Sequence, residues 1–260
     1  MNLDLRGKRA LVSGGTHGIG KAIAIELAKE GVDIAVFSRT PERVKEAKDF
    51  LSEYDIESIC IVADVLDNES FFKVESAIKE KWGGVDIVVN NVGGGGRWGS
   101  PDLLETTDLV WQEVYDKNLT SAMKYSRMFL PHMIEKKWGR VIAITSIYGK
   151  QAGGRPWFNV AKSAQTTLMK NLSRNPAYAS ANITFNSVAP GGIWIPNTGW
   201  ETMREKDPQG FEEFIRSNFP RGSMGTPEEV ANLVVFLCSD KASLISGASI
   251  AADGGESVYF

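Results

Sequence analysis

The chain has 260 residues, and its 29 basic and 32 acidic side chains give a formal net charge of -3 at pH 7. The two signs are interspersed, so there is no basic stripe to displace counterions from a phosphate backbone, and we expect no nucleic-acid partner. No apolar run approaches the roughly 18 residues that span a bilayer, and the N-terminus lacks the apolar core of a signal peptide. We therefore expect a cytoplasmic protein that does not enter a membrane.

Apolar runs of strand length alternate with segments of helical period along the whole chain. The predicted strands are 10–13, 33–37, 58–63, 86–90, 141–145, 184–188 and 249–251. The predicted helices are 19–30, 41–53, 68–81, 107–136, 158–179 and 227–237. This alternation is typical of βαβ units, and it predicts an α/β fold in which one parallel sheet of seven strands carries helices on both faces, as a single domain over 1–260.

Two of these helices have clear start signals. Thr40 precedes Pro41 and Thr226 precedes Pro227, and acidic residues follow within the first turn in both cases. A hydroxyl side chain before the helix, proline at its first position and acidic residues in its first turn all favour a helix start.

The segment 191–225 lacks clear strand or sheet-packing signals, apart from a short polar helix expected around 211–217. It contains Trp194, Trp200 and several prolines. A long insertion after the carboxyl end of a strand is where a substrate lid would lie, and we predict that role; a surface excursion with a small core of its own is the alternative.

Cys60 and Cys238 both lie in apolar runs. A small buried hydrophobe is the expected role for such cysteines. We therefore assign them neither a disulfide nor a metal, and we expect no metal site.

The sequence SGGTHGIG follows the first predicted strand and leads into a helix. Glycines there permit a tight turn in which backbone N–H groups approach a pyrophosphate, while the following helix directs its positive end at the same anion. The strand–loop–helix context predicts a Rossmann-type, doubly wound dinucleotide-binding domain. The predicted cofactor contacts in this loop are Gly14, Thr16, His17, Gly18, Ile19 and Gly20.

The loop spacing Ser13-Gly14-x-x-x-Gly18-x-Gly20 resembles the TGxxxGxG fingerprint of the short-chain dehydrogenase/reductase family. Further stretches that resemble this family follow in order over essentially the whole chain: Asp64-Val65, NNVGGGG from Asn90, Asn118, Ser146, Lys162, Pro190-Gly191 and SGASIAADGG from Ser246. The resemblance implies a nicotinamide cofactor and a small-molecule substrate. It also implies a homodimer or homotetramer paired through the helices 107–136 and 158–179.

The end of the second strand predicts which nicotinamide cofactor is used. An acidic residue there would bind the adenosine ribose hydroxyls, whereas this chain has Ser38 and Arg39. A guanidinium can hold a 2′-phosphate with two parallel charge-assisted hydrogen bonds, and Ser38, Thr40 and His17 can assist. The predicted cofactor is therefore NADP(H).

The resemblance implies further cofactor contacts. Asp64 would accept a hydrogen bond from the adenine amino group and Val65 would pack on the ring, while Asn90, Asn91 and Gly93 would line the adenosine ribose and the nicotinamide side. The remaining implied contacts are Pro190, Gly191, Ile193 and Lys162. A threonine that usually follows this turn is replaced by Ile195, so Thr198 or backbone groups would take its place, and Arg97 in the glycine-rich loop is a candidate for binding an anionic substrate.

Most members of the resembled family use a Ser, a Tyr and a Lys four residues after the Tyr, with an Asn on the preceding long helix. The Tyr exchanges a proton with the substrate oxygen, the Lys lowers its pKa and holds the nicotinamide ribose, the Ser stabilises the oxygen, and the Asn orders a water. Ser146, Lys162 and Asn118 match, but the residue four positions before Lys162 is Phe158, which has no proton to donate.

Three groups are candidates for supplying the proton. Tyr148 would project to the same side as Ser146 if the backbone there is extended, and its pKa would fall beside Lys150 or Lys162. Lys150 is itself a second candidate. A water chain through Asn118 and Lys162 is the third.

The sequence thus predicts an atypical NADPH-dependent reductase of a small carbonyl or a conjugated enone. Hydride addition to an enone creates an enolate that Ser146 and Lys162 can stabilise until water protonates it, so the missing phenol matters least there. Ser146, Lys162, Asn118 and Tyr148 are the predicted catalytic residues. The alternative is an inactive NADP(H)-binding protein with a regulatory or scaffold role.

Overall fold

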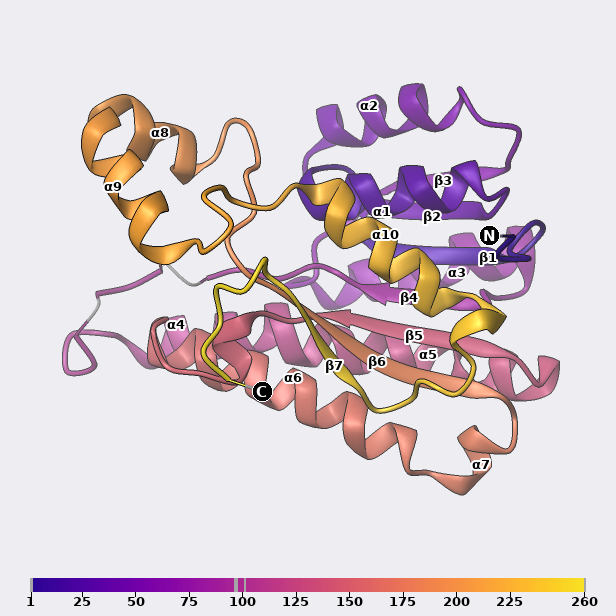
Figure 1. The fold of residues 1–260 in the computed structure, drawn as a ribbon. Coiled ribbons are helices and arrows are strands. Elements are labelled where there is room, and N and C mark those ends of the chain that lie inside the picture. Colours follow the sequence, from indigo (N-terminus) through magenta and orange to yellow (C-terminus); the bar gives the residue numbers. More distant parts are fainter. Residues whose placement is uncertain (1, 96–97, 101, 260) are drawn as a thin grey trace.

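The sheet organises the whole structure, a computed structural model that describes residues 2–95, 98–100 and 102–259 (Figure 1). Its order is β3-β2-β1-β4-β5-β6-β7, and all neighbouring strands are parallel. The strands are β1 (Arg9–Ser13), β2 (Asp33–Ser38), β3 (Ser58–Val62), β4 (Ile87–Asn90), β5 (Gly139–Ile144), β6 (Ile183–Pro190) and β7 (Ser249–Ala252). This arrangement confirms the predicted Rossmann-type α/β sheet.

The central strands are apolar on both faces because helices cover both sides of the sheet. Every residue of β4, β5 and β6 is buried. The register pairs Val12 of β1 with Val36 on one side and Val89 on the other, so β-branched side chains pack in rows across the sheet.

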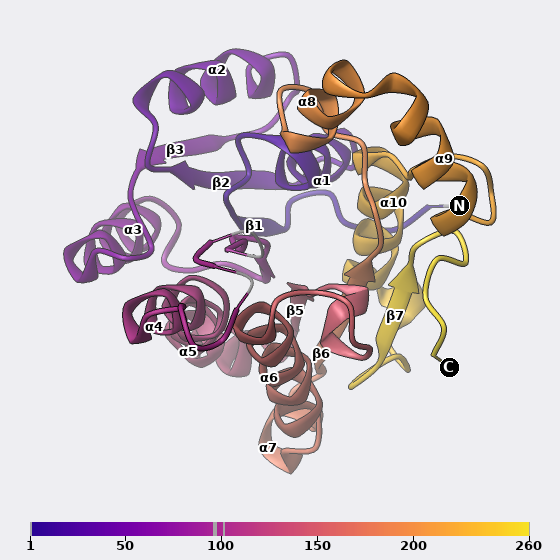
Figure 2. The ribbon, with the colours of Figure 1, turned by 90° about the vertical axis from the view of Figure 1, so that its left-hand side faces the viewer.

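Two layers of helices enclose the sheet (Figure 2). On one face lie α1 (Gly18–Lys29), α2 (Pro41–Leu51) and α10 (Pro227–Cys238), whose buried apolar residues form one core with the sheet. On the other face, α3 (Asn68–Trp82), α5 (Ser121–Lys136) and α6 (Pro156–Ser173) contribute to a second core. The sheet therefore has a helix-covered core on each face, which is the doubly wound arrangement.

The predicted helix starts differ in how they are capped. At α10 the Thr226 hydroxyl accepts from the N–H of Glu229 at 3.3 Å, and the Glu229 carboxylate accepts from the N–H of Thr226 at 2.9 Å, which forms a capping box. Thr40 precedes α2 as predicted, but its side chain makes no capping hydrogen bond.

The helix predicted over 107–136 is confirmed to within one residue at its start. It runs without a break through α4 (Asp108–Tyr115), the π-helical segment η1 (Asp116–Thr120) and α5. Polar side chains in this stretch bond to the preceding turn: Asn118 Nδ2 donates to the Val114 carbonyl at 2.7 Å, and Ser121 Oγ donates to the Lys117 carbonyl at 2.7 Å. Such side-chain bonds compete with regular helical pairing, and π turns inside helices are frequent at functional sites.

The helix predicted over 158–179 begins earlier and is broken. It consists of α6 and of the short α7 (Pro176–Ala179). Proline disfavours helical backbone in the residue before it, and Asn175 is extended there, with its side chain accepting from the N–H of Ala177 at 3.0 Å.

The segment 191–225 holds two helices rather than the one short helix predicted. They are α8 (Gly199–Lys206) and α9 (Pro208–Asn218), which lie side by side apart from the sheet (Figure 1). Their aromatic side chains form a small separate core of Trp194, Trp200, Phe211, Phe214 and Phe219, together with Ile215 and Met224.

Candidate active site

The candidate site begins where the strand order reverses, between the carboxyl ends of β1 and β4. Ser13 Oγ accepts from the N–H groups of Asn91 and Val92, each at 2.9 Å, and Asn91 Nδ2 donates to the Ser13 carbonyl at 2.9 Å. These bonds fix the two strand ends side by side. Open α/β sheets bind their ligands in the crevice at such a reversal.

The glycine loop lies in this crevice and requires its glycines. Gly14 and Gly18 have φ values of +64° and +54°, which favour residues without a Cβ. A Cβ on Gly20 would collide with the Asn91 amide and the Gly14 carbonyl, so the loop packs directly against the end of β4. This close packing fits a loop that presents backbone N–H groups to a pyrophosphate.

The other predicted contacts in this loop stand at the start of α1. Thr16 is buried, His17 is the extended residue before the helix, and Ile19 lies in its first turn. Burial, and then the charges of Arg43 and Lys21, lower the pKa of His17, so its imidazole is neutral near pH 7. It can therefore serve as a hydrogen-bond partner rather than as a cation.

A cavity of about 110 Å³ adjoins the glycine loop at the end of β2. It brings together four predicted residues, Ser38, Arg39, Asp64 and Val65, beside Gly14. Thr40 does not line this cavity, but its N–H donates to Ser38 Oγ at 3.3 Å and so helps to position that side chain.

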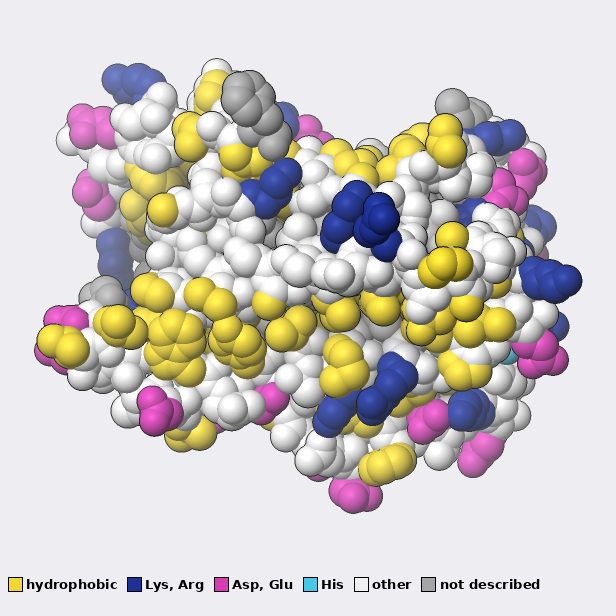
Figure 3. All heavy atoms as spheres, turned by 90° about the horizontal axis from the view of Figure 1, so that it is seen from below, with side chains coloured by type: hydrophobic (Ala, Val, Ile, Leu, Met, Phe, Trp, Pro, Cys, Tyr) yellow, Lys and Arg dark blue, Asp and Glu magenta, His cyan; other side chains and the backbone are white. Residues whose placement is uncertain are grey.

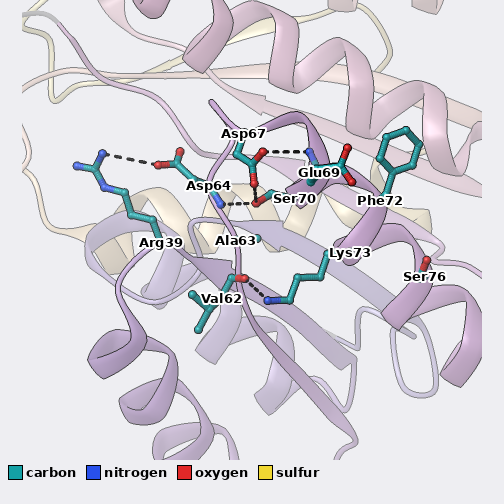
Figure 4. Close-up of a pocket in the computed structure, with 10 residues that line it drawn as sticks. All are labelled: Arg39, Val62, Ala63, Asp64, Asp67, Glu69, Ser70, Phe72, Lys73 and Ser76. Atoms are coloured by element: carbon teal, nitrogen blue, oxygen red, sulfur yellow. Dashed lines mark hydrogen bonds and ion pairs between the residues drawn. The ribbon is translucent and has the colours of Figure 1, made fainter.

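Arg39 and Asp64 face each other with 4.0 Å between Nη1 and Oδ2, and both also line a neighbouring cavity of about 800 Å³, which Figure 4 shows. The Arg39 side chain is 63% exposed, so this long pair holds it weakly and leaves the guanidinium available to an anion. The backbone N–H of Asp64 donates to Ser70 Oγ at 3.1 Å, and Ser70 Oγ donates to Asp67 Oδ2 at 2.8 Å. The turn that carries Asp64 is thereby fixed to α3.

Lys117 was not predicted to belong to the site. It directly precedes the predicted site residue Asn118, and this position of a cation next to a site residue was a signal in the sequence. Lys117 lines the 110 Å³ cavity with Arg39 and Asp64, and its ammonium lies 4.6 Å from the centre of the Trp98 ring. Burial and then the positive charge of Arg39 lower the pKa of Lys117. Two cations placed so near to each other form a site that favours an anion.

Lys162 and Asn118 converge on Gly93. A Cβ on Gly93 would stand 2.8 Å from Asn118 Oδ1 and 2.9 Å from Lys162 Nζ. Asn118 is fully buried; its Nδ2 donates to the Gly94 carbonyl at 2.9 Å and its Oδ1 accepts from the Gly94 N–H at 3.2 Å. The π turn η1 thus points the Asn118 amide at the glycine-rich loop.

The Lys162 ammonium is buried and donates to the Ile144 carbonyl at 2.8 Å and to Gln165 Oε1 at 3.0 Å. Burial lowers its pKa to about 7. The side chain can therefore gain or lose a proton near neutral pH, which suits proton transfer.

Ser146 follows β5 and lines a cavity of about 820 Å³ together with Tyr148 and Phe158. The backbone from Ser146 to Tyr148 is not extended, because Ile147–Gly149 form a turn of 3₁₀ helix and Ser146 Oγ accepts from the Tyr148 N–H at 3.2 Å, yet both side chains line the same cavity. The pKa of Tyr148 does not fall as considered above. Burial, and then the charge of Glu256, raise the pKa of this phenol.

Phe158 presents a hydrocarbon ring to the same cavity. Its other neighbours are apolar and aromatic, among them Trp98, Trp111 and Trp157. Lys150 does not line the cavity; its ammonium lies 4.3 Å from the centre of the Tyr259 ring. Arg97, expected to bind an anionic substrate, lies outside the described residues.

The turn after β6 forms another wall of the 820 Å³ cavity. Gly191 and Gly192 line it, while Ile193 is buried and pairs with Gly225. Thr198, the expected substitute for the missing threonine, donates its hydroxyl to the Ile195 carbonyl at 2.7 Å. Pro190 ends β6, which places this turn at the carboxyl edge of the sheet.

Glu256 is a second lining residue that the sequence did not indicate. Its Oε2 accepts from the Gly192 N–H at 2.5 Å. Burial, and then the charge of Asp253, raise the pKa of this carboxyl group. It directly follows the stretch 246–255, but nothing in that stretch indicates that its carboxyl group reaches the cavity.

Within the described part of the chain, no group of three or more His, Cys, Asp or Glu side chains is arranged to hold a metal ion. Among the same residues, no helix is both long and apolar enough to cross a bilayer. The cytoplasmic location stays a prediction.

Residues 14–257 match a family described as Enoyl-(Acyl carrier protein) reductase. The chain is 35% identical over 257 residues to the 3-oxoacyl-[acyl-carrier-protein] reductase FabG of Aquifex aeolicus, covering 98% of this chain and 99% of that protein. It is also 35% identical over 271 residues to the uncharacterized oxidoreductase YvaG of Bacillus subtilis, covering 98% of each.

The fold is also close to that of a solved reductase. L-sorbose reductase from Gluconobacter frateurii, in complex with NADPH and L-sorbose, superimposes with a TM-score of 0.90 at 31% identity, covering the whole of both chains. The similarity of sequence and of structure therefore extends over the glycine loop, both cavities and the segment 191–225.

Proposed function

Because the chain belongs to the short-chain dehydrogenase/reductase family, we propose that it is an NADPH-dependent reductase of a small carbonyl or conjugated enone. The observation that carries the proposal is the convergence of Asn118 and Lys162 on Gly93, close to the wall on which Ser146 faces an 820 Å³ cavity. A buried amine of lowered pKa beside such a cavity is typical of a catalytic site.

The residues present fit a nicotinamide dinucleotide. The glycine loop and the start of α1 would hold the pyrophosphate, Asp64 and Val65 the adenine, and Lys162 the nicotinamide ribose. When bound, the reduced nicotinamide supplies a hydride.

A preference for NADP(H) is supported by the charges at the end of β2. Arg39 and Lys117 both border the 110 Å³ cavity, where an adenosine 2′-phosphate would meet two cations. The carboxylate of Asp64 opposes such a phosphate, but its pair with Arg39 is long and largely solvated. Two positive charges against one negative charge favour the phosphate.

Ser146 and Lys162 have separate tasks in this proposal. The Ser146 hydroxyl donates a hydrogen bond to the substrate oxygen as negative charge develops on it, which lowers the barrier to reduction. Lys162, with Asn118, holds a proton at the ribose side of the site and can pass it along ordered water.

The segment 191–225 is proposed to be the substrate lid. Trp200 and Phe214, from α8 and α9, line the 820 Å³ cavity together with Ser146, and their rings stack with centroids 5.7 Å apart. A lid that presents aromatic rings to the cavity would bind an apolar part of the substrate and exclude water during the reaction.

We also propose that the protein is a homodimer or homotetramer. Hydrophobic side chains form a band on the face seen from below in Figure 3, the side of α6 and α7. Helices α4, α5 and α6 carry the exposed apolar side chains Leu109, Ile134 and Val160. A contiguous apolar surface of this kind is typical of an interface, and light scattering would measure the number of subunits.

The test is NADPH consumption with a panel of ketones, aldehydes and enones, measured on the wild type, Ser146→Ala and Lys162→Ala. We expect at least one substrate to be reduced by the wild type and both variants to lose about 100-fold or more in kcat/KM. If NADPH binds tightly and no substrate is reduced, the reductase proposal fails. The alternative, an inactive NADP(H)-binding regulatory or scaffold protein, would then stand.

A further inference from the structure

The C-terminal segment closes one side of the candidate active site. The Asp253 carboxylate accepts from the N–H groups of Gly255 at 3.0 Å and Ser257 at 2.9 Å, which makes a tight turn after β7. The N–H of Val258 donates to Gln151 Oε1 at 2.9 Å. The turn is therefore tied to the segment that carries Ser146 and Tyr148.

This turn presents Glu256 to the glycine pair after β6. Its Oε2 accepts from the Gly192 N–H at 2.5 Å, and a Cβ on Gly191 would collide with the same oxygen. Behind the pair, a Cβ on Gly192 would collide with the Phe219 ring. Glycine at both positions lets the carboxyl group reach the cavity wall from one side while Phe219 packs on the other.

Glu256 shares the 820 Å³ cavity with Ser146, Tyr148 and Phe158. Among the described residues that line this cavity, it is the one carboxylic acid. Phe158 cannot donate a proton, so a substrate beside Ser146 would have the Tyr148 phenol and the Glu256 carboxyl group as acidic neighbours.

We propose that Glu256 is the general acid that protonates the substrate oxygen, a role that rests on the proposed reductase function. The carbon–oxygen π bond breaks, the carbon gains the hydride that NADPH supplies, and the oxygen takes the proton of the Glu256 carboxyl group. NADPH is oxidised to NADP⁺ and the carbonyl is reduced to an alcohol. Glu256 is left as a carboxylate and regains a proton from solvent.

The electrostatics of the cavity support Glu256 over Tyr148. Burial and the Asp253 charge raise the pKa of Glu256 towards neutrality, against the opposing hydrogen bond from Gly192. Burial and the Glu256 charge move the pKa of Tyr148 upward, away from neutrality. A general acid is most effective when its pKa is near the working pH, which favours the carboxyl group.

Charged and titratable groups lie around Glu256 on each packed segment. Tyr148 and Arg155 line the same cavity, and Asp253 lies in the same turn. Lys150 stacks on Tyr259, and the Arg221 side chain lies beside Gly254. A pH dependence of kcat is therefore assigned to Glu256 only if the replacement of Glu256 itself removes it.

The test compares Glu256→Gln with the matched control Glu80→Gln on the exposed part of α3. We expect Glu256→Gln to bind NADPH as tightly as the wild type and to lose about 100-fold or more in kcat. Wild-type kcat should fall as the pH rises through the pKa of the acid, and this limb should be absent from the variant. In the cofactor-free protein, infrared titration should show a carboxyl band that titrates above the ordinary range of a glutamic acid, which Glu256→Gln removes and Glu80→Gln retains.

Each outcome is decisive. If the wild type reduces a carbonyl and Glu256→Gln keeps its rate and its pH profile, Glu256 is not the acid, while the reductase proposal stands. If the wild type reduces nothing, the reductase proposal and the acid role fail together. If Glu256→Gln unfolds, Glu256→Asp takes its place. This variant is expected to keep the carboxyl band and the fall in kcat with rising pH. A Glu256→Asp variant whose kcat does not fall with rising pH would overturn the proposal.

Discussion

The ammonium nitrogen of Lys162 lies 5.9 Å from the centre of the Phe158 ring, one helical turn earlier in α6. The ring packs with Trp98 and Trp157 and lines the 820 Å³ cavity. A hydroxyl at the end of this ring would enter the cavity near a buried amine. One oxygen atom, that of the hydroxyl group tyrosine would carry here, therefore distinguishes this site from one with a phenol at position 158.

Phe158→Tyr is expected to add a second proton donor. The new hydroxyl would lie near Lys162, whose charge lowers the pKa of a phenol and makes it a better acid. We expect the double variant Phe158→Tyr, Glu256→Gln to reduce a simple ketone with a kcat at least about 10-fold higher than that of Glu256→Gln alone. Stopped-flow measurement of NADPH oxidation would test this, and a rate no higher than that of Glu256→Gln alone would contradict it.

Arg39→Ala is expected to weaken NADPH binding and to leave NADH binding nearly unchanged. Loss of charge-assisted hydrogen bonds to a phosphate costs about 1.5–3 kcal/mol, or roughly 10- to 150-fold in Kd. Lys117→Ala should have a smaller effect of the same kind, because a lysine offers a point charge without a planar fork. Fluorescence titration at two salt concentrations measures both, with the exposed Arg174→Ala as the control. Equal losses for NADPH and NADH would argue against a 2′-phosphate site.

Lys162→Met is expected to stabilise the cofactor-free protein in a pH-dependent way. The pKa of Lys162 is 10.5 in the unfolded chain and about 7 in the folded protein, so between these values unfolding takes up a proton. The free energy of unfolding of the wild type, relative to that of Lys162→Met, is therefore lowest below pH 7. Between pH 7 and pH 10.5 this difference rises by at most about 1.4 kcal/mol per pH unit.

Denaturant unfolding of both proteins across this pH range would measure the difference. The same change at the exposed Lys170, Lys170→Met, serves as the control. A difference between the wild type and Lys162→Met that stays constant with pH would show that burial does not shift the pKa of the Lys162 amine.

Trp200→Ala is expected to weaken substrate binding without affecting the cofactor. Trp200 lines the 820 Å³ cavity and stacks on Phe214, whereas the 110 Å³ cavity beside Arg39 is formed by other elements. We expect KM for the carbonyl substrate to rise about 10-fold, which corresponds to roughly 1.4 kcal/mol of lost apolar contact. Met203→Ala, on the same helix but outside the cavity lining, should leave KM unchanged. An unaltered KM in Trp200→Ala would remove the support for a lid.

The elements that follow from local patterns could be predicted from the sequence. Buried strands and amphipathic helices repeat with their own periods, so the seven strands and most of the helices were assigned to within a few residues. The prediction missed the π-helical segment at 116–120, where polar side chains bond to the helix backbone, and the break before Pro176. Both features depend on individual polar or proline residues, which an apolar period does not reveal.

The sequence by itself determined the sheet, the glycine loop with its neighbour Arg39, and the presence of Phe158 four residues before Lys162. Only the tertiary structure decided which charged side chains from other parts of the chain lie beside these features. Lys117 meets Arg39 because η1 passes the end of β2, and Glu256 meets Gly192 across 64 residues of chain. Such contacts depend on how separate elements pack against each other. The spacing of residues within one motif does not reveal that packing. The acid that would replace the missing phenol was therefore found in the fold rather than in a motif.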